Sequence, residues 1–210
     1  MEEVEKVSEA LRLVEKYESY LFRKAWGTNL IVWGILVPLN ALLILKAKPI
    51  ADILSMSAEA FMSLASAMIL IAGGAIVIYT LTSATIATSR RRKFSFRRDM
   101  PHAVAIFLIW FISFNLTAFV PERFGVVSLL WAAGSASLLS YLVLRKVPVH
   151  GSYPELLLVG LILLIASLPI AGVTHAALAQ TATLVIFAVS FVAGGIYSII
   201  IASKALSESG

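Results

Sequence analysis

The sequence predicts an all-α fold: a polytopic membrane protein with a bundle of six transmembrane helices behind an N-terminal amphipathic helix. Hydrophobic residues make up 60% of the 210 residues and charged residues only 14%, whereas about 25% of an average soluble domain is charged. Six long apolar runs carry almost no charge, and ~20 apolar residues are enough to cross a bilayer core. Lys and Arg collect in alternate gaps between these runs, as expected when successive loops lie on opposite sides of a membrane.

The first segment, residues 1–24, is predicted to form a cytoplasmic amphipathic helix. Its apolar residues recur at spacings of three, four or seven, which is the pattern of one helix face; they are Val4, Val7, Leu11, Val14 and Leu21. An amphipathic helix of this size fits a membrane surface, but here Glu outnumbers Lys and Arg, and anionic headgroups repel acidic side chains. Charge therefore favours packing against a cytoplasmic protein partner or a second copy.

The membrane domain is predicted over residues 25–204, followed by a short cytoplasmic tail, 205–210. Its spans are expected at residues 26–46, 58–82, 102–120, 125–144, 155–173 and 176–202. Helix-capping residues support several of the starts. Ser57 precedes the second span, Thr174 precedes the sixth, and residues 152–155 read Ser-Tyr-Pro-Glu, the pattern of a capping box.

The distribution of positive charge predicts the orientation. Of the 17 Lys and Arg residues, only Lys46, Lys48 and Arg123 lie on one side, which leaves 14 for the other. Cytoplasmic loops hold the excess of Lys and Arg, so both termini are expected in the cytoplasm. The basic run Arg90–Arg98 is then expected to face lipid headgroups, and no binding of nucleic acid is predicted.

A threefold repeat of helical hairpins is a further hypothesis. The second helix of each hairpin contains a similar tripeptide, and a gapless alignment of the first helices brings three polar residues to one position. The tripeptides are Ala72-Gly73-Gly74, Ala133-Gly134-Ser135 and Ala193-Gly194-Gly195, and the aligned residues are Asn40, Asn115 and Ser167. Chance similarity between apolar sequences is the alternative explanation.

Small residues inside the spans predict helix contacts, because close packing in a membrane favours them. Ser190, Gly194 and Ser198 recur every four residues in the sixth span. The full set expected at helix contacts is Gly73, Gly74, Gly134, Ser190, Gly194 and Ser198. Lining a polar pathway is the alternative role for such stripes.

The spans contain few groups with chemical reactivity. No Asp, Glu, Lys or Arg lies near the middle of any predicted span, which argues against a proton-coupled transporter or a voltage sensor. Cysteine is absent, so disulfides and thiolate chemistry are excluded. No catalytic residues, metal ligands or cofactor motif are identified, and a non-enzymatic protein is predicted.

Three amide side chains inside the spans are the candidate substrate-binding residues: Asn40, Asn115 and Gln180. A buried amide needs a hydrogen-bond partner in a bilayer. An interhelical hydrogen bond would satisfy it, and so would a neutral polar ligand.

Residues at the first span resemble a known family. Arg23-Lys24-Ala25-Trp26, leading into Trp33-Gly34-Ile35-Leu36, resembles the start of the hairpin repeats in the acid-resistance HdeD membrane-protein family. That resemblance implies a six-span protein built of short hairpins, although the later hairpins lack the turn motifs of the family. An interfacial helix before the first span is also similar to that of six-span export permeases, but no coupling motif follows it.

Two functions are therefore expected. One is a transport-related membrane subunit, or a passive pathway for a neutral or lipid-like substrate, that docks a cytoplasmic partner. The alternative is a regulatory or stress-related membrane protein that acts through protein–protein contacts. The low content of Asn, Gln and Cys fits a thermophilic source, and it equally fits the composition of membrane spans.

Overall fold

The computed structural model describes residues 2–88, 96–121, 124–145 and 153–207. All regular secondary structure in these ranges is helical, so the predicted all-α class is confirmed. The helices are α1 (Glu2–Leu45), α2 (Ala47–Ile53), α3 (Ala58–Thr88), α4 (Phe96–Leu116), a 3-10 turn (Thr117–Phe119), α5 (Gly125–Leu144), α6 (Pro154–Ala171) and α7 (Ala176–Ser207).

Five of these helices are long and apolar enough to cross a membrane: α1, α3, α5, α6 and α7. In α4 the described apolar stretch is shorter, Val104–Leu116. Large apolar side chains such as Ile71, Phe107 and Leu168 lie exposed on the outside of the helices. A surface of this kind is typical of contact with lipid. The chain is therefore a multi-pass membrane protein by the composition of its helices.

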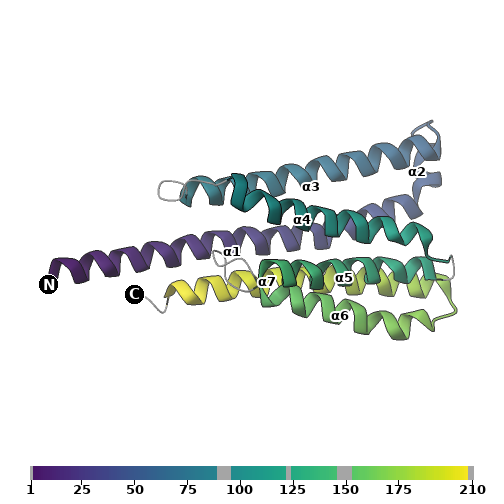
Figure 1. Ribbon diagram of the computed structural model, residues 1–210. Helices are drawn as coiled ribbons and strands as arrows, with labels where there is room; N and C mark the ends of the chain where they lie inside the picture. The colour runs from purple at the N-terminus through teal and green to yellow at the C-terminus, as the bar shows by residue number, and fades with distance from the viewer. Residues whose placement is uncertain (1, 89–95, 122–123, 146–152, 208–210) are drawn as a thin grey trace.

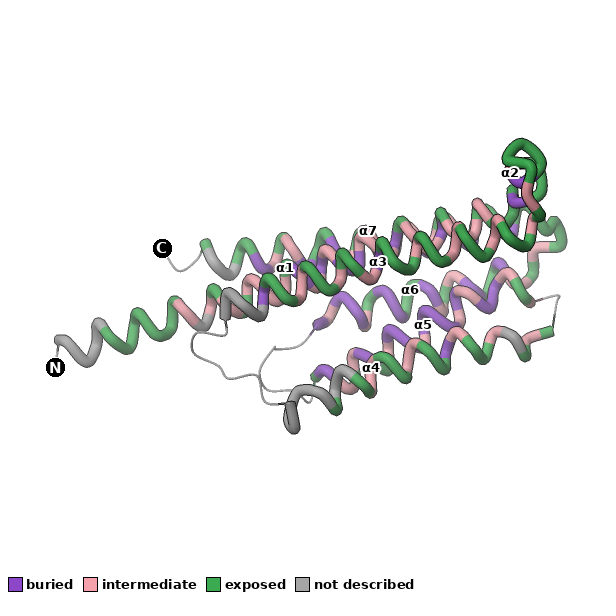
Figure 2. Tube along the Cα trace, turned by 90° about the horizontal axis from the view of Figure 1, so that it is seen from above, coloured by how far each residue is buried: buried purple, intermediate pink, exposed green. Residues whose placement is uncertain are grey.

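The long helices run side by side, and both termini lie at the same end (Figure 1). Each helix packs against the next in the spatial order α3, α1, α7, α6, α5, α4. Viewed from above, α3, α1 and α7 lie together, and α5 and α4 lie on the other side of α6 (Figure 2). Hence α3 and α4 stand at the two ends of this series.

The N-terminal segment continues the first span instead of forming a separate helix. α1 runs without a break through 44 residues, a length of ~66 Å at 1.5 Å per residue. A bilayer core accounts for only ~30 Å of this length, so the first turns project beyond the other helices (Figure 1). A straight extension of a spanning helix does not lie along the membrane surface. Contact with a partner or a second copy stays a prediction.

Local capping explains two helix starts. The backbone N–H of Ala60 donates to Ser57 Oγ at 3.1 Å, which confirms Ser57 as the cap of α3. At the start of α7 the N–H of Leu178 donates to His175 Nδ1 at 3.3 Å. His175 therefore caps this helix, in place of the expected Thr174.

The structure describes only part of the predicted capping box at residues 152–155. Ser152 lies outside the described residues. Tyr153 precedes α6 and makes no side-chain capping bond. The carboxylate of Glu155 binds Arg23 and Ser198 of other helices instead.

Glycines allow α1 and α7 to approach at the level of their backbones. A Cβ added to Gly195 would collide with the carbonyl oxygen of Gly27, and one added to Gly34 would lie 2.8 Å from Phe191 Cβ. The sequence pattern had not identified Gly27 or Gly34 as packing residues. In a membrane, such close approach replaces the hydrophobic driving force that water supplies to soluble proteins.

The glycines that were expected at helix contacts differ in their surroundings. An added Cβ would lie 2.9 Å from Trp33 at Gly73, 2.8 Å from Leu164 at Gly134 and 2.6 Å from Val159 at Gly194. At Gly74 it would meet no atom within 4 Å, so this residue makes no close helix contact. Ser190 and Ser198 are buried.

The apolar core lies among α5, α6 and α7 and is closed by α4 and α1. Phe187 and Phe191 stack with ring centroids 4.5 Å apart, and Trp110 of α4 meets Phe191 edge-on at 6.0 Å. The Trp110 indole N–H donates to Ser140 of α5 at 3.1 Å. This aromatic cluster fixes α4 to the rest of the bundle.

Replacing Gly195 with Ala is expected to destabilise the protein, because the new methyl group would overlap the Gly27 carbonyl. Overpacking of this kind typically costs about 1–3 kcal/mol. Thermal unfolding in a mild detergent measures the effect. The matched variant Gly74→Ala adds the same methyl group in open space and should leave the unfolding temperature unchanged or raise it. Equal behaviour of the two variants would contradict the close α1–α7 contact.

Candidate functional site

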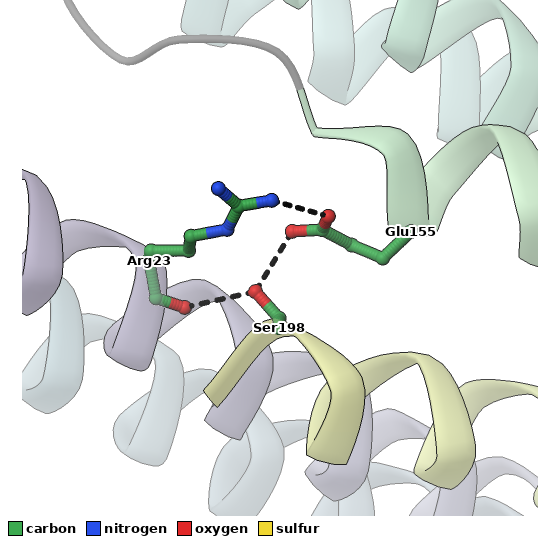
Figure 3. A network of polar contacts seen from close by, with 3 residues as sticks. All are labelled: Arg23, Glu155 and Ser198. Atoms are coloured by element: carbon green, nitrogen blue, oxygen red, sulfur yellow. Dashed lines mark hydrogen bonds and ion pairs between the residues drawn. The ribbon is translucent and has the colours of Figure 1, made fainter. Parts of the chain in front are cut away.

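A buried polar network joins three helices near the end that holds the termini (Figure 3). Arg23 of α1 donates to Glu155 Oε2 of α6 at 3.2 Å. Ser198 of α7 lies 2.7 Å from Glu155 Oε1 and 3.2 Å from the Arg23 carbonyl oxygen, through its Oγ atom. The network therefore ties α1, α6 and α7 together across more than a hundred residues of sequence.

Electrostatics explains why these groups pair. The Glu155 side chain is 0% exposed and that of Arg23 is 23% exposed, and a buried carboxylate without a cation is strongly unfavourable. Ser198 has one hydroxyl proton for two acceptors, and the shorter contact directs that proton to the carboxylate. Glu155 is thus held in place by a guanidinium on one oxygen and a hydroxyl on the other.

Two aromatic residues border this network. The rings of Trp26 and Tyr153 lie 5.5 Å apart, centroid to centroid. Burial raises the pKa of the Tyr153 phenol well above its usual value, and the nearby Glu155 carboxylate adds to this effect. The phenol therefore stays neutral across the physiological range.

Sequence patterns had assigned both charged residues of this network to local roles. Arg23 belongs to the Arg-Lys-Ala-Trp segment at the start of the first span, and Glu155 belongs to the capping-box pattern of residues 152–155. The stripe of small residues on α7 could have indicated this site, because Ser198 follows Gly194 by one turn on that stripe. The network joins helices, and the Glu155 carboxylate and the Arg23 guanidinium are already paired with each other.

A cavity lies at the opposite end of the bundle, between the end of α1 and the starts of α5 and α7. Its volume is about 320 Å³. The lining residues are Ala41, Ile44, Leu45, Gly125, Val126, Leu129, Gln180, Thr183 and Leu184. All nine are uncharged, and Gln180 and Thr183 bring the polar side chains.

The polar groups of this cavity come from one face of α7. Gln180 and Thr183 are three residues apart, so their side chains are neighbours on the helix. Thr183 Oγ1 is buried and has no hydrogen-bond partner in the described structure. A buried hydroxyl without a partner is unfavourable by about 1–3 kcal/mol.

The three predicted substrate-binding residues are not brought together. Asn40 Oδ1 accepts from Ser66 Oγ of α3 at 3.1 Å, and Asn115 Nδ2 donates to the Phe111 carbonyl of its own helix at 2.7 Å. Both therefore have a hydrogen bond within the protein. Gln180 alone lines the cavity.

Another amide makes a contact that the sequence did not indicate. Asn29 is buried in α1, and its Oδ1 accepts from Thr80 Oγ1 of α3 at 2.9 Å. Together with the bond between Asn40 and Ser66, it fixes α3 against α1 at two levels of the membrane. These two amides therefore join α1 to α3.

Comparisons of the chain with protein-family models, with curated proteins and with solved structures find no match.

Removing the Glu155 carboxylate is expected to destabilise the protein because the Arg23 guanidinium would lose its counterion. Removing one member of a fully buried ion pair costs about 3–5 kcal/mol, and the partial exposure of Arg23 reduces this. Thermal unfolding in detergent should show a lower stability for Glu155→Leu. The double variant Arg23→Met/Glu155→Leu should recover part of the loss. Strictly additive effects of the two changes would contradict the coupling.

Proposed function

We propose that this membrane protein binds a neutral, largely apolar or lipid-like molecule in the cavity between α1, α5 and α7, as a transport-related subunit or passive pathway. The observation that carries the proposal is the lining of the cavity, which is uncharged and mostly apolar. Its volume of about 320 Å³ falls within the ~300–1,000 Å³ range of ligand sites.

The polar atoms of the cavity define the chemistry of the ligand. Thr183 Oγ1 lacks a partner and Gln180 supplies an amide from the same helix face. A molecule with an apolar body and one hydroxyl, carbonyl or ester group would bind the Gln180 amide. Inorganic ions and charged metabolites fit poorly because no lining residue would balance their charge.

The proposal includes six spans with both termini in the cytoplasm. α4 packs beside α5, and the apolar stretch of α4 extends to Leu116. Both observations support a sixth crossing. An even number of crossings agrees with termini at one end of the molecule (Figure 1). The 14-to-3 distribution of Lys and Arg supports a cytoplasmic location for that end.

The hairpin repeat also belongs to this proposal. The hairpins would be α1 with α3, α4 with α5, and α6 with α7. Between hairpins, α1 packs on α7 and α6 packs on α5. In both cases the first helix of one hairpin meets the second helix of another. A closed ring of three hairpins would also need α4 to pack on α3, and in the described residues these two helices stand at opposite ends of the series.

A regulatory membrane protein that acts through protein contacts is the second candidate. The observation that favours it is the projection of α1 beyond the other helices (Figure 1), where Val7 and Leu11 are exposed. A cytoplasmic partner docked on this segment would serve either function.

Filling the cavity is expected to abolish ligand binding. The protein is purified from native membranes, and the small molecules that accompany it are extracted and identified by mass spectrometry. The wild-type protein should carry an uncharged, lipid-like molecule that Ala41→Phe loses and Gln180→Leu retains less well. The control Ala72→Phe adds the same ring at an exposed position on α3 and should retain the molecule. Identical contents in all variants, or no such molecule in the wild type, would contradict the proposal.

Single cysteines test the topology, since the protein has none of its own. Leu54→Cys lies between α2 and α3 and Phe119→Cys follows α4, and both positions are exposed. Both should react with a membrane-impermeant thiol reagent added outside intact cells, whereas Ser207→Cys at the end of α7 should not. Failure of Phe119→Cys alone would show that α4 does not cross, and the reverse pattern would overturn the orientation.

A further inference from the structure

The first turns of α1 present an apolar stripe that no other described helix covers. Val7 is 60% exposed and Leu11 is 43% exposed, on a segment that projects beyond α3 and α7 (Figure 1). Outside a membrane, each exposed side chain of this size forgoes about 1.5–3 kcal/mol of burial. A solvated extension of a spanning helix has no need of such a stripe.

The spacing of the stripe is that of a coiled coil. With Val4 at position a of a heptad, the a and d positions are Val4, Val7, Leu11, Val14, Glu18 and Leu21. Five of these six residues are apolar. These a and d positions form a continuous apolar stripe, which Ala10 and Tyr17 widen at position g, and such a stripe matches contact with another helix of the same kind.

Insertion in a membrane makes a second copy of α1 the suitable helix. Copies of one protein share the same orientation in a membrane, so their α1 helices project from the same side, parallel and at the same height. Position a of one helix then faces position a of the other without any adjustment of register. A soluble partner helix would have to find that register by itself.

The charges of the segment are compatible with parallel pairing. In a parallel coiled coil each g residue faces the e residue five positions later on the partner. The g residues are Glu3, Ala10 and Tyr17, and the facing e residues are Ser8, Glu15 and Phe22. Glu3 and Glu15 therefore belong to different pairs, and no pair brings like charges together. The charged residues 5, 6, 9, 12 and 16 fall on the outer positions b, c and f.

We propose that residues 4–21 of α1 form a parallel coiled coil with the same segment of a second copy of this chain. Glu18 occupies an a position and places two carboxylates face to face in the assembly. A polar residue at a single a position lowers the stability of a coiled coil. The proposal is independent of the cavity and its ligand.

Disulfide cross-linking in native membranes tests the proposal, because the natural chain contains no cysteine. Leu11→Cys is placed on the stripe at position a, and Leu13→Cys on position c. The two leucines are equally exposed, at 43% and 44%, so they differ only in the face of the helix on which they lie. Further along α1, position c is occupied by Gly27 and Gly34, which pack against α7.

Mild oxidation should convert most of the Leu11→Cys protein, and little of the Leu13→Cys protein, to a cross-linked dimer of this chain. Equal cross-linking of the two variants, no cross-linking of Leu11→Cys, or its cross-linking to a different protein would overturn the proposal. Oligomer mass in detergent, measured by light scattering, gives the second readout. Leu11→Glu should lower the dimer fraction, Leu13→Glu should leave it unchanged, and Glu18→Leu should raise it. A dimer fraction that is the same in all three would count against a coiled coil.

Discussion

The backbone contact between α1 and α7 at Gly27 and Gly195 is the constraint on which the rest of the molecule depends. Apolar helices surrounded by lipid gain little from hydrophobic burial, so close van der Waals contact must hold them. This contact also brings the Arg23 carbonyl within 3.2 Å of Ser198 Oγ, which in turn positions Glu155 and the start of α6. Since α3 packs on α1 and α5 packs on α6, the positions of the helices on both sides of the bundle depend on this one contact.

The sequence predicted the elements better than it predicted their contacts, for a physical reason. Hydropathy and charge are properties of the local sequence, so the long apolar helices and the Ser57 cap of α3 could be predicted. Glu155 has the spacing of a local capping residue, but an arginine 132 positions earlier in the chain competes for the same carboxylate. The charge of that arginine provides the stronger hydrogen bond, and only the fold brings it near.

The three candidate amides illustrate the same limit. Asn40, Asn115 and Gln180 are equivalent by type and by position inside an apolar run. Asn40 meets Ser66 of α3, while Gln180 lines a gap left between three helices. Whether an amide binds a neighbouring helix or a ligand depends on the distance between helices, and glycines on other segments set that distance. The cavity could therefore not be predicted from periodicity.

α1 takes part in the ion-pair network, the close contact with α7 and the cavity, and its backbone lacks a hydrogen bond at one point between them. Arg23 and Gly27 belong to the tightly packed part near the termini, whereas Ala41 and Ile44 line the cavity. Pro38 lies between these parts, and since proline has no N–H, the carbonyl of Gly34 loses its helical hydrogen bond. Bending of α1 is therefore easiest at the turn from Gly34 to Pro38. The buried ion pair and the close contact with α7 lie on one side of this turn, and the part of α1 that lines the cavity lies on the other.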